Sequence, residues 1–174
     1  MTAENYLKQE NPTRKIKIEK VVLSVGGTAD KLEKGYKLLA FLSGMIPLRT
    51  KSRKRIPSLG VRPGLEVGAK VTLRGVKMTG LLKQLLEAND RRLKESQVSE
   101  NTLSFGIKEY IEIPEIEYQR DIGIAGFDVT ITFARMGKRI IYKKKGSKLP
   151  KKQHVSKDEI VNFMKDKFKA EFLE

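Results

Sequence analysis

The order of strand-like and helix-like segments predicts an α+β fold, built as a single domain over residues 1–174. Strands and helices are mixed without the strict alternation that produces a parallel sheet. Two strand-like segments also follow one another late in the chain, and 39% of the residues are hydrophobic, enough to form a core. We expect a mostly antiparallel, curved sheet with helices packed on one face and two long basic loops.

The first predicted strand covers residues 15–25, and the basic stretch 10–20 contains its start. Apolar and polar residues alternate over its second half, so the apolar set should face the core. The alternation slips by one residue near Glu19, which predicts a β-bulge. The residues expected to face the core are Val21, Leu23 and Val25.

Two helices are predicted in the first half of the chain. The first covers residues 30–43, and Asp30 with Glu33 has the spacing of a capping box at its start. The second covers residues 79–94. Their expected buried stripes are Leu32, Tyr36, Leu39 and Leu42 in the first helix, and Leu82, Leu85, Leu86 and Leu93 in the second.

Three further strands are predicted at residues 68–74, 101–113 and 126–135. A terminal helix begins at Ser156, which forms a capping box with Glu159. Its expected buried stripe is Ile160, Phe163, Met164 and Phe168.

The strand phases also predict the side chains on the uncovered face of the sheet. If the helices cover the face that holds Leu23, Val71, Phe105 and Phe133, the other face is rich in hydroxyls. Threonine is common in solvated strands, which accounts for such a face without any function. The alternative is that short hydroxyls approach an RNA minor groove and bond to ribose 2′-hydroxyls. The residues of this face are Ser24, Thr72, Arg74, Thr102, Ser104, Thr130 and Thr132.

Two stretches without a carboxylate carry the positive charge. The 32 residues between Glu33 and Glu66 contain eight Lys or Arg, and the 29 between Asp128 and Asp158 contain ten. The other 113 residues hold 18 basic and 21 acidic side chains, so the two stretches account for the net charge of +15. The basic loops within them are residues 49–64 and 135–155. Clustered cations on a near-neutral body are typical of a nucleic-acid-binding protein.

Composition excludes several classes of site. The chain has no cysteine and one histidine, His154, which excludes thiol nucleophiles, Cys-ligated zinc and multi-histidine metal sites. We expect no cofactor and no metal. No apolar run approaches the length of a membrane span, and the N-terminus does not resemble a signal peptide, so an intracellular chain without a membrane partner is expected.

Evidence for catalysis is weak. Gly26-Gly27-Thr28 lacks the remaining residues of a phosphate-binding loop. The acidic residues between Glu109 and Glu117 are the one cluster that suggests metal or acid–base chemistry, and they more simply face solvent. A structural RNA-binding protein is therefore favoured over an enzyme. The alternatives are a non-ribosomal RNA-binding protein, a DNA-binding domain, or an RNA-processing enzyme that uses these glutamates.

An ordered series of motifs resembles one family. The series is Asn11-Pro12, Gly44-x-x-Pro47, Gly60-Val61-Arg62, Val71-Thr-Leu-Arg-Gly75, Ser104-Phe-Gly-Ile107 and Ile122-Gly-Ile-x-Gly-x-Asp128. It resembles the universal large-subunit ribosomal protein that binds 5S rRNA in the central protuberance, numbered five in bacteria and eleven in eukaryotes. The Lys-rich tract and the short length resemble archaeal or eukaryotic members more than bacterial ones.

The resemblance implies a cytoplasmic, non-enzymatic constituent of the large ribosomal subunit. It implies that the chain binds 5S rRNA and large-subunit rRNA, meets neighbouring ribosomal proteins, and contacts P-site tRNA through residues 49–62. Expected 5S rRNA contacts are Asn11, Arg14, Lys15, Ser24, Lys70, Thr72 and Arg74. Expected tRNA contacts are Arg49, Lys51, Arg53, Lys54, Arg55 and Arg62. Expected large-subunit rRNA contacts are Arg135, Lys138, Arg139, Lys143, Lys144, Lys145, Lys148, Lys151 and Lys152.

Two positions depart from the family pattern. Ser24 stands where the family often has Asn, and it keeps a hydroxyl. Met45 stands where the family often has Gln, and a thioether neither donates nor accepts a strong hydrogen bond.

Overall fold

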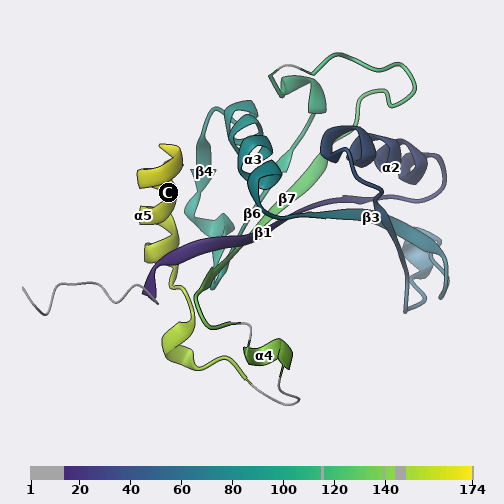
Figure 1. Ribbon diagram of the computed structural model, residues 1–174. Helices are drawn as coiled ribbons and strands as arrows, with labels where there is room; N and C mark the ends of the chain where they lie inside the picture. The colour runs from purple at the N-terminus through teal and green to yellow at the C-terminus, as the bar shows by residue number, and fades with distance from the viewer. Residues whose placement is uncertain (1–13, 115, 139, 144–147, 174) are drawn as a thin grey trace, which may run out of the picture.

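The computed structural model describes residues 14–114, 116–138, 140–143 and 148–173. Its centre is a six-stranded antiparallel sheet with the strand order β2-β3-β1-β7-β6-β5. Helices α2 and α3 lie on one side of this sheet (Figure 1), which confirms the predicted α+β fold. The strands are β1 (Ile16–Gly26), β2 (Leu48–Lys51), β3 (Glu66–Leu73), β5 (Val98–Ser99), β6 (Thr102–Ile107) and β7 (Phe127–Arg135). The helices are α2 (Asp30–Ser43), α3 (Val76–Ala88), α4 (Ile140–Lys143) and α5 (Lys157–Phe168).

The predicted alternation of strand faces is confirmed by burial. Leu23, Val71, Phe105 and Phe133 are all buried on the helix side of the sheet. The ring of Phe133 meets the ring of Phe163 on α5 edge-on, with centroids 5.7 Å apart. The terminal helix therefore packs on the same face as α2 and α3, and the opposite face is left uncovered.

The β-bulge predicted near Glu19 is present. The register of β1 against β7 shifts between Ile18 and Lys20. The extra residue lets both halves of β1 keep their apolar side chains on one face, because a bulge resets the two-residue alternation. Ile16 and Ile18 accordingly pack, partly buried, against the core.

Helix α2 has the predicted bounds, but the predicted capping box at its start is wrong. The N-cap is Ala29, with φ of 48°, and no side chain caps the helix. Asp30 is already helical, one position too late to serve as the cap. Gly35 in the middle of α2 has a packing reason, since a Cβ there would lie 2.5 Å from Cγ1 of Val25 on β1. The glycine therefore lets the helix lie directly on the sheet.

The second helix was predicted too long at its C-terminus and too short at its N-terminus. Helix α3 ends at Ala88 because Asp90 and Arg91 have φ angles of 51° and 58°, in the left-handed region that terminates a helix. Leu93 is buried as predicted, but it lies in a short strand, β4 (Arg92–Lys94). This strand pairs in parallel with a C-terminal strand, β8 (Glu171–Leu173), which the sequence did not predict.

The predicted strand over residues 101–113 is also too long. Strand β6 ends at Ile107, and Tyr110–Glu112 form a 3-10 helix whose tyrosine is buried. The hydroxyl of Tyr110 accepts a hydrogen bond from the backbone N–H of Gln119 at 2.9 Å. Local apolar residues thus continued beyond the strand because they serve the core from a different element.

The capping box predicted for the terminal helix is confirmed. The hydroxyl of Ser156 accepts from the backbone N–H of Glu159 at 3.4 Å, and the Glu159 carboxylate accepts from the backbone N–H of Ser156 at 3.0 Å. Two otherwise unpaired N–H groups at the start of α5 are thereby bonded. Within the described ranges, no helix is both long enough and apolar enough to span a bilayer.

Candidate nucleic-acid interface

The uncovered face of the sheet is lined by short hydroxyl side chains. The register places Thr72 of β3 beside Val22 of β1. Val22 lies in turn beside Thr130 of β7, and Thr130 lies beside Ser104 of β6. The hydroxyl oxygens of Ser104 and Thr130 are 3.1 Å apart and share a hydrogen bond. The exposed or half-buried residues of this surface, called here the open face, are Lys20, Val22, Ser24, Lys70, Thr72, Thr102, Ser104, Asp128, Thr130 and Thr132.

Three of the residues expected at 5S rRNA come together on the open face, and these are Ser24, Lys70 and Thr72. Arg74 is exposed directly after the end of β3. Arg14 and Lys15 are exposed directly before the start of β1. Asn11 lies outside the described residues. The open face is therefore continuous with cations at the ends of two of its strands.

The first basic loop is shorter and more ordered than the sequence suggested. Its first part is the edge strand β2, which pairs with β3 and contains Arg49 and Lys51. The remainder, residues 52–64, is called here the tip. Within it, Ile56 and Val61 exchange two backbone hydrogen bonds of 2.9 and 3.1 Å, and the carbonyl of Ser52 accepts from the backbone N–H of Gly64 at 2.9 Å. These bonds preset the shape of the tip.

The cations of the first basic loop fall into two groups. Arg49 is turned back onto the domain, where it bonds to Glu66 at 3.0 Å and to Glu33 at 2.9 Å. Its guanidinium carbon also lies 4.8 Å from the ring centre of Tyr36. The other group is exposed and makes no ion pair with any described residue, and it comprises Lys51, Arg53, Lys54, Arg55 and Arg62. Only this second group is available to an anionic partner without breaking a contact.

The tip also exposes apolar side chains beside its cations. Ile56 is 40% exposed and Leu59 is 68% exposed. Leu65, at the base of the tip, is 42% exposed. The sequence interpretation considered phosphate contacts alone and missed this apolar surface, although the residues themselves were visible.

The second basic loop is held at its base by ion pairs that the sequence did not reveal. Arg135 donates to both carboxylate oxygens of Glu159, at 2.6 and 2.7 Å. Lys138 pairs with Glu19 in the bulge of β1. Both cations were expected to contact rRNA, and both already have a carboxylate partner within the domain. Lys143, Lys148 and Lys151 are exposed, as expected for contact residues.

The far end of this loop returns to the sheet at Val155. Its backbone N–H donates to Oδ1 of Asn101 at 2.8 Å. The lone histidine, His154, lies here with Nδ1 3.2 Å from Nδ2 of Asn101. Between the two ends of the loop, the expected contacts Arg139, Lys144 and Lys145 and the side chain of Lys152 lie outside the described residues.

The Glu159 carboxyl is an electrostatic link between α5 and β7. Burial raises the pKa of Glu159, but the hydrogen bond from the Ser156 backbone and the nearby guanidinium of Arg135 lower it more strongly. The net result is a pKa below the ordinary value of 4.5. Glu159 is therefore ionised at neutral pH and serves the capping box and the ion pair together.

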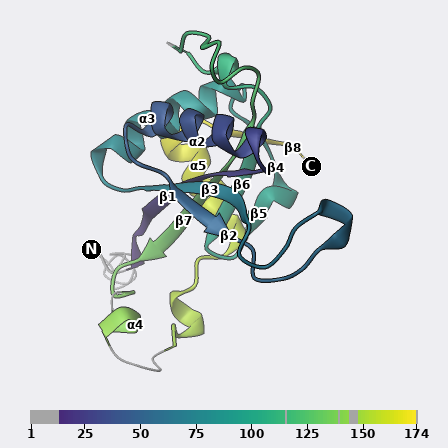
Figure 2. The same cartoon turned by 90° about the vertical axis from the view of Figure 1, so that its right-hand side faces the viewer.

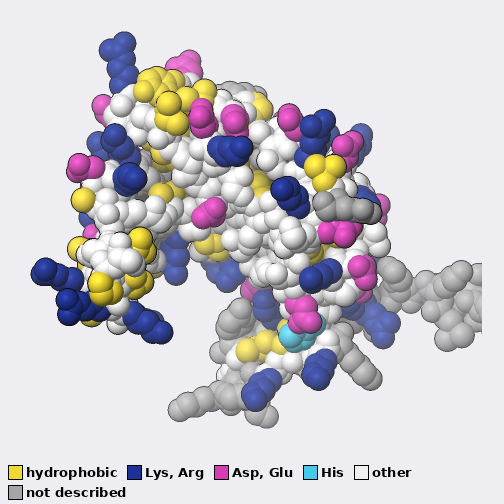
Figure 3. Space-filling model, turned by 180° about the vertical axis from the view of Figure 1, so that it is seen from behind, with side chains coloured by type: hydrophobic (Ala, Val, Ile, Leu, Met, Phe, Trp, Pro, Cys, Tyr) yellow, Lys and Arg dark blue, Asp and Glu magenta, His cyan; other side chains and the backbone are white. Residues whose placement is uncertain are grey.

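The tip and the second basic loop project from opposite ends of the open face. Figure 1 shows the tip descending beyond β3 and the α4 segment descending beyond β7, on the side away from α2 and α3. The view turned by 90° shows the same separation (Figure 2). Seen from behind, the surface is hollowed between these two lobes, and Lys and Arg side chains lie on both of them (Figure 3). The open face thus forms the roof of a hollow flanked by cations.

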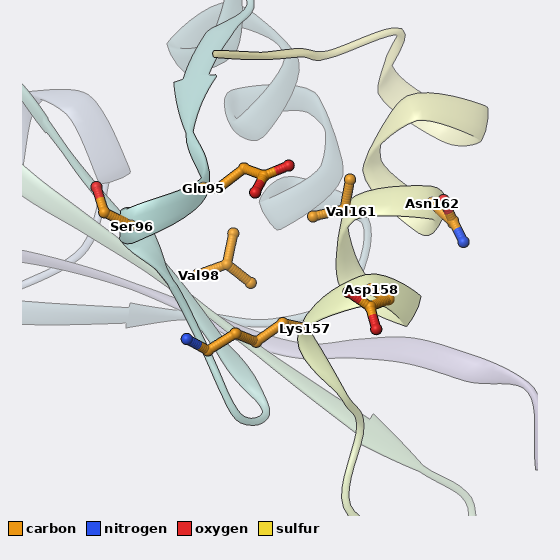
Figure 4. A pocket seen from close by; sticks show the side chains of 7 residues that line it. All are labelled: Glu95, Ser96, Val98, Lys157, Asp158, Val161 and Asn162. Atoms are coloured by element: carbon orange, nitrogen blue, oxygen red, sulfur yellow. The ribbon is translucent and has the colours of Figure 1, made fainter. Parts of the chain in front are cut away.

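The remaining polar clusters form no comparable surface. Within the described part of the chain, no three His, Asp or Glu side chains are close enough together to hold a metal ion. A cavity of about 370 Å³ lies between the residues before β6 and the first turns of α5 (Figure 4). Its charged lining residues are Glu95, Lys157 and Asp158, so it has no excess of positive charge. It lies apart from the open face.

Comparison with known proteins gives consistent matches along nearly the whole chain. The family model for the C-terminus of the uL5 ribosomal proteins matches residues 66–163. The chain is 40% identical to the large ribosomal subunit protein uL5 of Sulfolobus acidocaldarius, over 96% of each chain. It is 39% identical to the protein of the same name from Nanoarchaeum equitans, over 94% of this chain and 99% of that one. It is 40% identical to that of Sulfurisphaera tokodaii, over 94% and 96%.

Proposed function

The chain belongs to the uL5 family of ribosomal proteins and is a structural protein of the large ribosomal subunit, and from this premise we propose that its open face binds 5S rRNA. The observation that carries the proposal is the row of hydroxyl side chains on a sheet face that no described helix covers. Short hydroxyls permit close approach to the wide, shallow minor groove of an RNA helix. There they can exchange hydrogen bonds with ribose 2′-hydroxyls, which DNA lacks.

The two cationic lobes extend this interface to further RNA. The tip carries exposed cations on a preset backbone, so it is suited to a folded RNA surface such as the elbow of P-site tRNA. The second basic loop presents Lys143, Lys148 and Lys151 to large-subunit rRNA. No aromatic stacking platform accompanies these cations in the tip, so phosphate contacts supply most of its affinity. In this arrangement the protein recognises RNA shape and helps to attach 5S rRNA to the subunit.

The experiment that tests the open face is a double substitution, Thr72→Val with Arg74→Ala. Both side chains lie at the surface, so the loss should appear in 5S rRNA affinity and leave the melting temperature nearly unchanged. The matched control is Thr79→Val with Lys83→Ala on α3, which removes a hydroxyl and a cation from the helix side. Affinity would be measured by filter binding over a range of salt concentrations.

Two outcomes would contradict the proposal. Equal loss of affinity in the control pair would show that general charge, and not the open face, holds the RNA. A flat response to salt would also contradict it. Each neutralised phosphate should contribute about 0.7–0.9 to the slope of log affinity against log salt.

A further inference from the structure

We propose that Arg135 is a positioning residue, which fixes the base of the second basic loop and does not itself contact RNA. This inference rests on the proposed function of that loop as an rRNA-binding element. Arg135 is the last residue of β7, and Glu159 lies in the first turn of α5. The two hydrogen bonds between them therefore join the two ends of residues 136–155.

The burial of Arg135 argues against a role in phosphate contact. Its side chain is 13% exposed, whereas the exposed lysines of the same loop are open to solvent. One guanidinium nitrogen, NH2, donates to both oxygens of Glu159. Its Nε is buried without a hydrogen-bond partner among the described atoms. Moving the guanidinium to a phosphate would leave the Glu159 carboxylate without its cation, which is unfavourable.

Other contacts at the same base support a positioning role. Lys138 is anchored to Glu19 in the bulge of β1. At the other end, the backbone N–H of Asn101 donates to the carbonyl of Val155, and the Asn101 side chain accepts from the Val155 N–H. Contacts from β1, from the residue before β6 and from α5 thus converge where the loop leaves and rejoins the domain.

The expected consequence is that the loop is oriented before RNA arrives. A loop held in its bound direction loses less conformational freedom on binding, so more of its contact energy appears as affinity. Exposed cations such as Lys148 would supply the phosphate contacts, and Arg135 would decide where those cations are held. A contact residue and a positioning residue then differ in their salt dependence.

The test compares two charge-neutralising substitutions in binding to an in vitro transcript of the large-subunit rRNA. Lys148→Gln should lower the slope of log affinity against log salt by about 0.7–0.9, as expected for one lost phosphate contact. Arg135→Gln should weaken binding about threefold, through the added cost of ordering the loop, and leave that slope unchanged. A slope that falls equally in both variants would show that Arg135 contacts phosphate and would overturn the inference.

A second comparison tests the sign of the effect. Glu159→Gln removes a negative charge from an RNA-binding protein, so simple electrostatics predicts tighter binding. The positioning role predicts weaker binding, because a neutral amide accepts from the guanidinium more weakly than a carboxylate. The control is Asp158→Asn, which removes the neighbouring charge on the same turn of α5 and should not weaken binding. Tighter binding in both variants would overturn the inference.

A measurement without RNA separates this inference from the proposed function. Limited trypsin digestion of the free protein should cut faster between residues 138 and 152 in Arg135→Gln and Glu159→Gln than in wild type or Asp158→Asn. Arg135→Lys should restore slower cutting, since it keeps a cation that can donate to Glu159. Equal cutting in all five proteins would overturn the positioning role. Failure of the wild-type protein to bind rRNA would instead contradict the proposed function alone.

Discussion

The tip and the second basic loop have similar charge in the sequence but are organised in opposite ways. The tip is ordered by its own backbone hydrogen bonds, and its cations, Arg53 to Arg55 and Arg62, are exposed and unpaired among the described residues. The second basic loop is held from outside, by carboxylates on β1 and α5 and by Asn101 beside β6. A dense run of cations therefore does not reveal which of them are free to bind a partner.

The largest expected effect is on the base of the second basic loop. Asn101→Ala should destabilise the protein by about 2–3 kcal/mol, because alanine is strained at φ of 61° and the buried Val155 N–H loses its acceptor. Asn101→Gly is the control, since glycine adopts this φ freely and isolates the hydrogen-bond loss. Urea denaturation would measure both. Equal stability of the two variants would mean that backbone strain contributes nothing here.

The next effect sharpens the contrast at the tip. Replacing Arg53, Lys54 and Arg55 together with Gln should lower the salt slope for tRNA binding by about 2–2.7, if each contacts one phosphate. Arg49→Gln is the matched control and should leave the slope unaltered, because Arg49 is already paired with Glu33 and Glu66. Binding to 5S rRNA should be little affected by the triple substitution. Equal loss for both RNAs would assign the tip to the 5S rRNA interface.

A smaller effect concerns pH and the ion pair at the second loop. The folded-state pKa of Glu159 lies below its ordinary value of 4.5, so its ionised form stabilises the fold at neutral pH. That contribution is lost as the pH falls below 4.5 and through the folded-state pKa. The difference in unfolding free energy between wild type and Glu159→Gln should shrink over this range. A difference that stays constant with pH would show that Glu159 acts through packing.

The smallest expected effect is on stability at the first loop. Arg49→Gln should leave the free energy of unfolding nearly unchanged, because its ion pairs are exposed and screened by solvent. Thermal melting at low and high salt would measure it. A marked loss at both salt concentrations would mean that the contact with Tyr36, and not the ion pairs, holds β2 in place.

Much of the local structure could be predicted because it depends on neighbouring residues. Strand alternation revealed which face of the sheet is buried, and its slip revealed the bulge before Lys20. The Ser156 capping box spans three residues and was predicted correctly. The early end of α3 was missed because an apolar residue, Leu93, continued the helical pattern while belonging to a strand paired with the C-terminus.

The sequence by itself determined that the protein has two cationic loops and a hydroxyl-lined sheet face, because charge content and two-residue alternation are local properties. Only the tertiary structure decided which cations are free. Arg135 meets a carboxylate 24 residues away, and Lys138 meets one 119 residues away. Such partners are brought together by the packing of α5 and the bulge of β1 against β7. Spacing along the chain carries no signal of contacts at that separation.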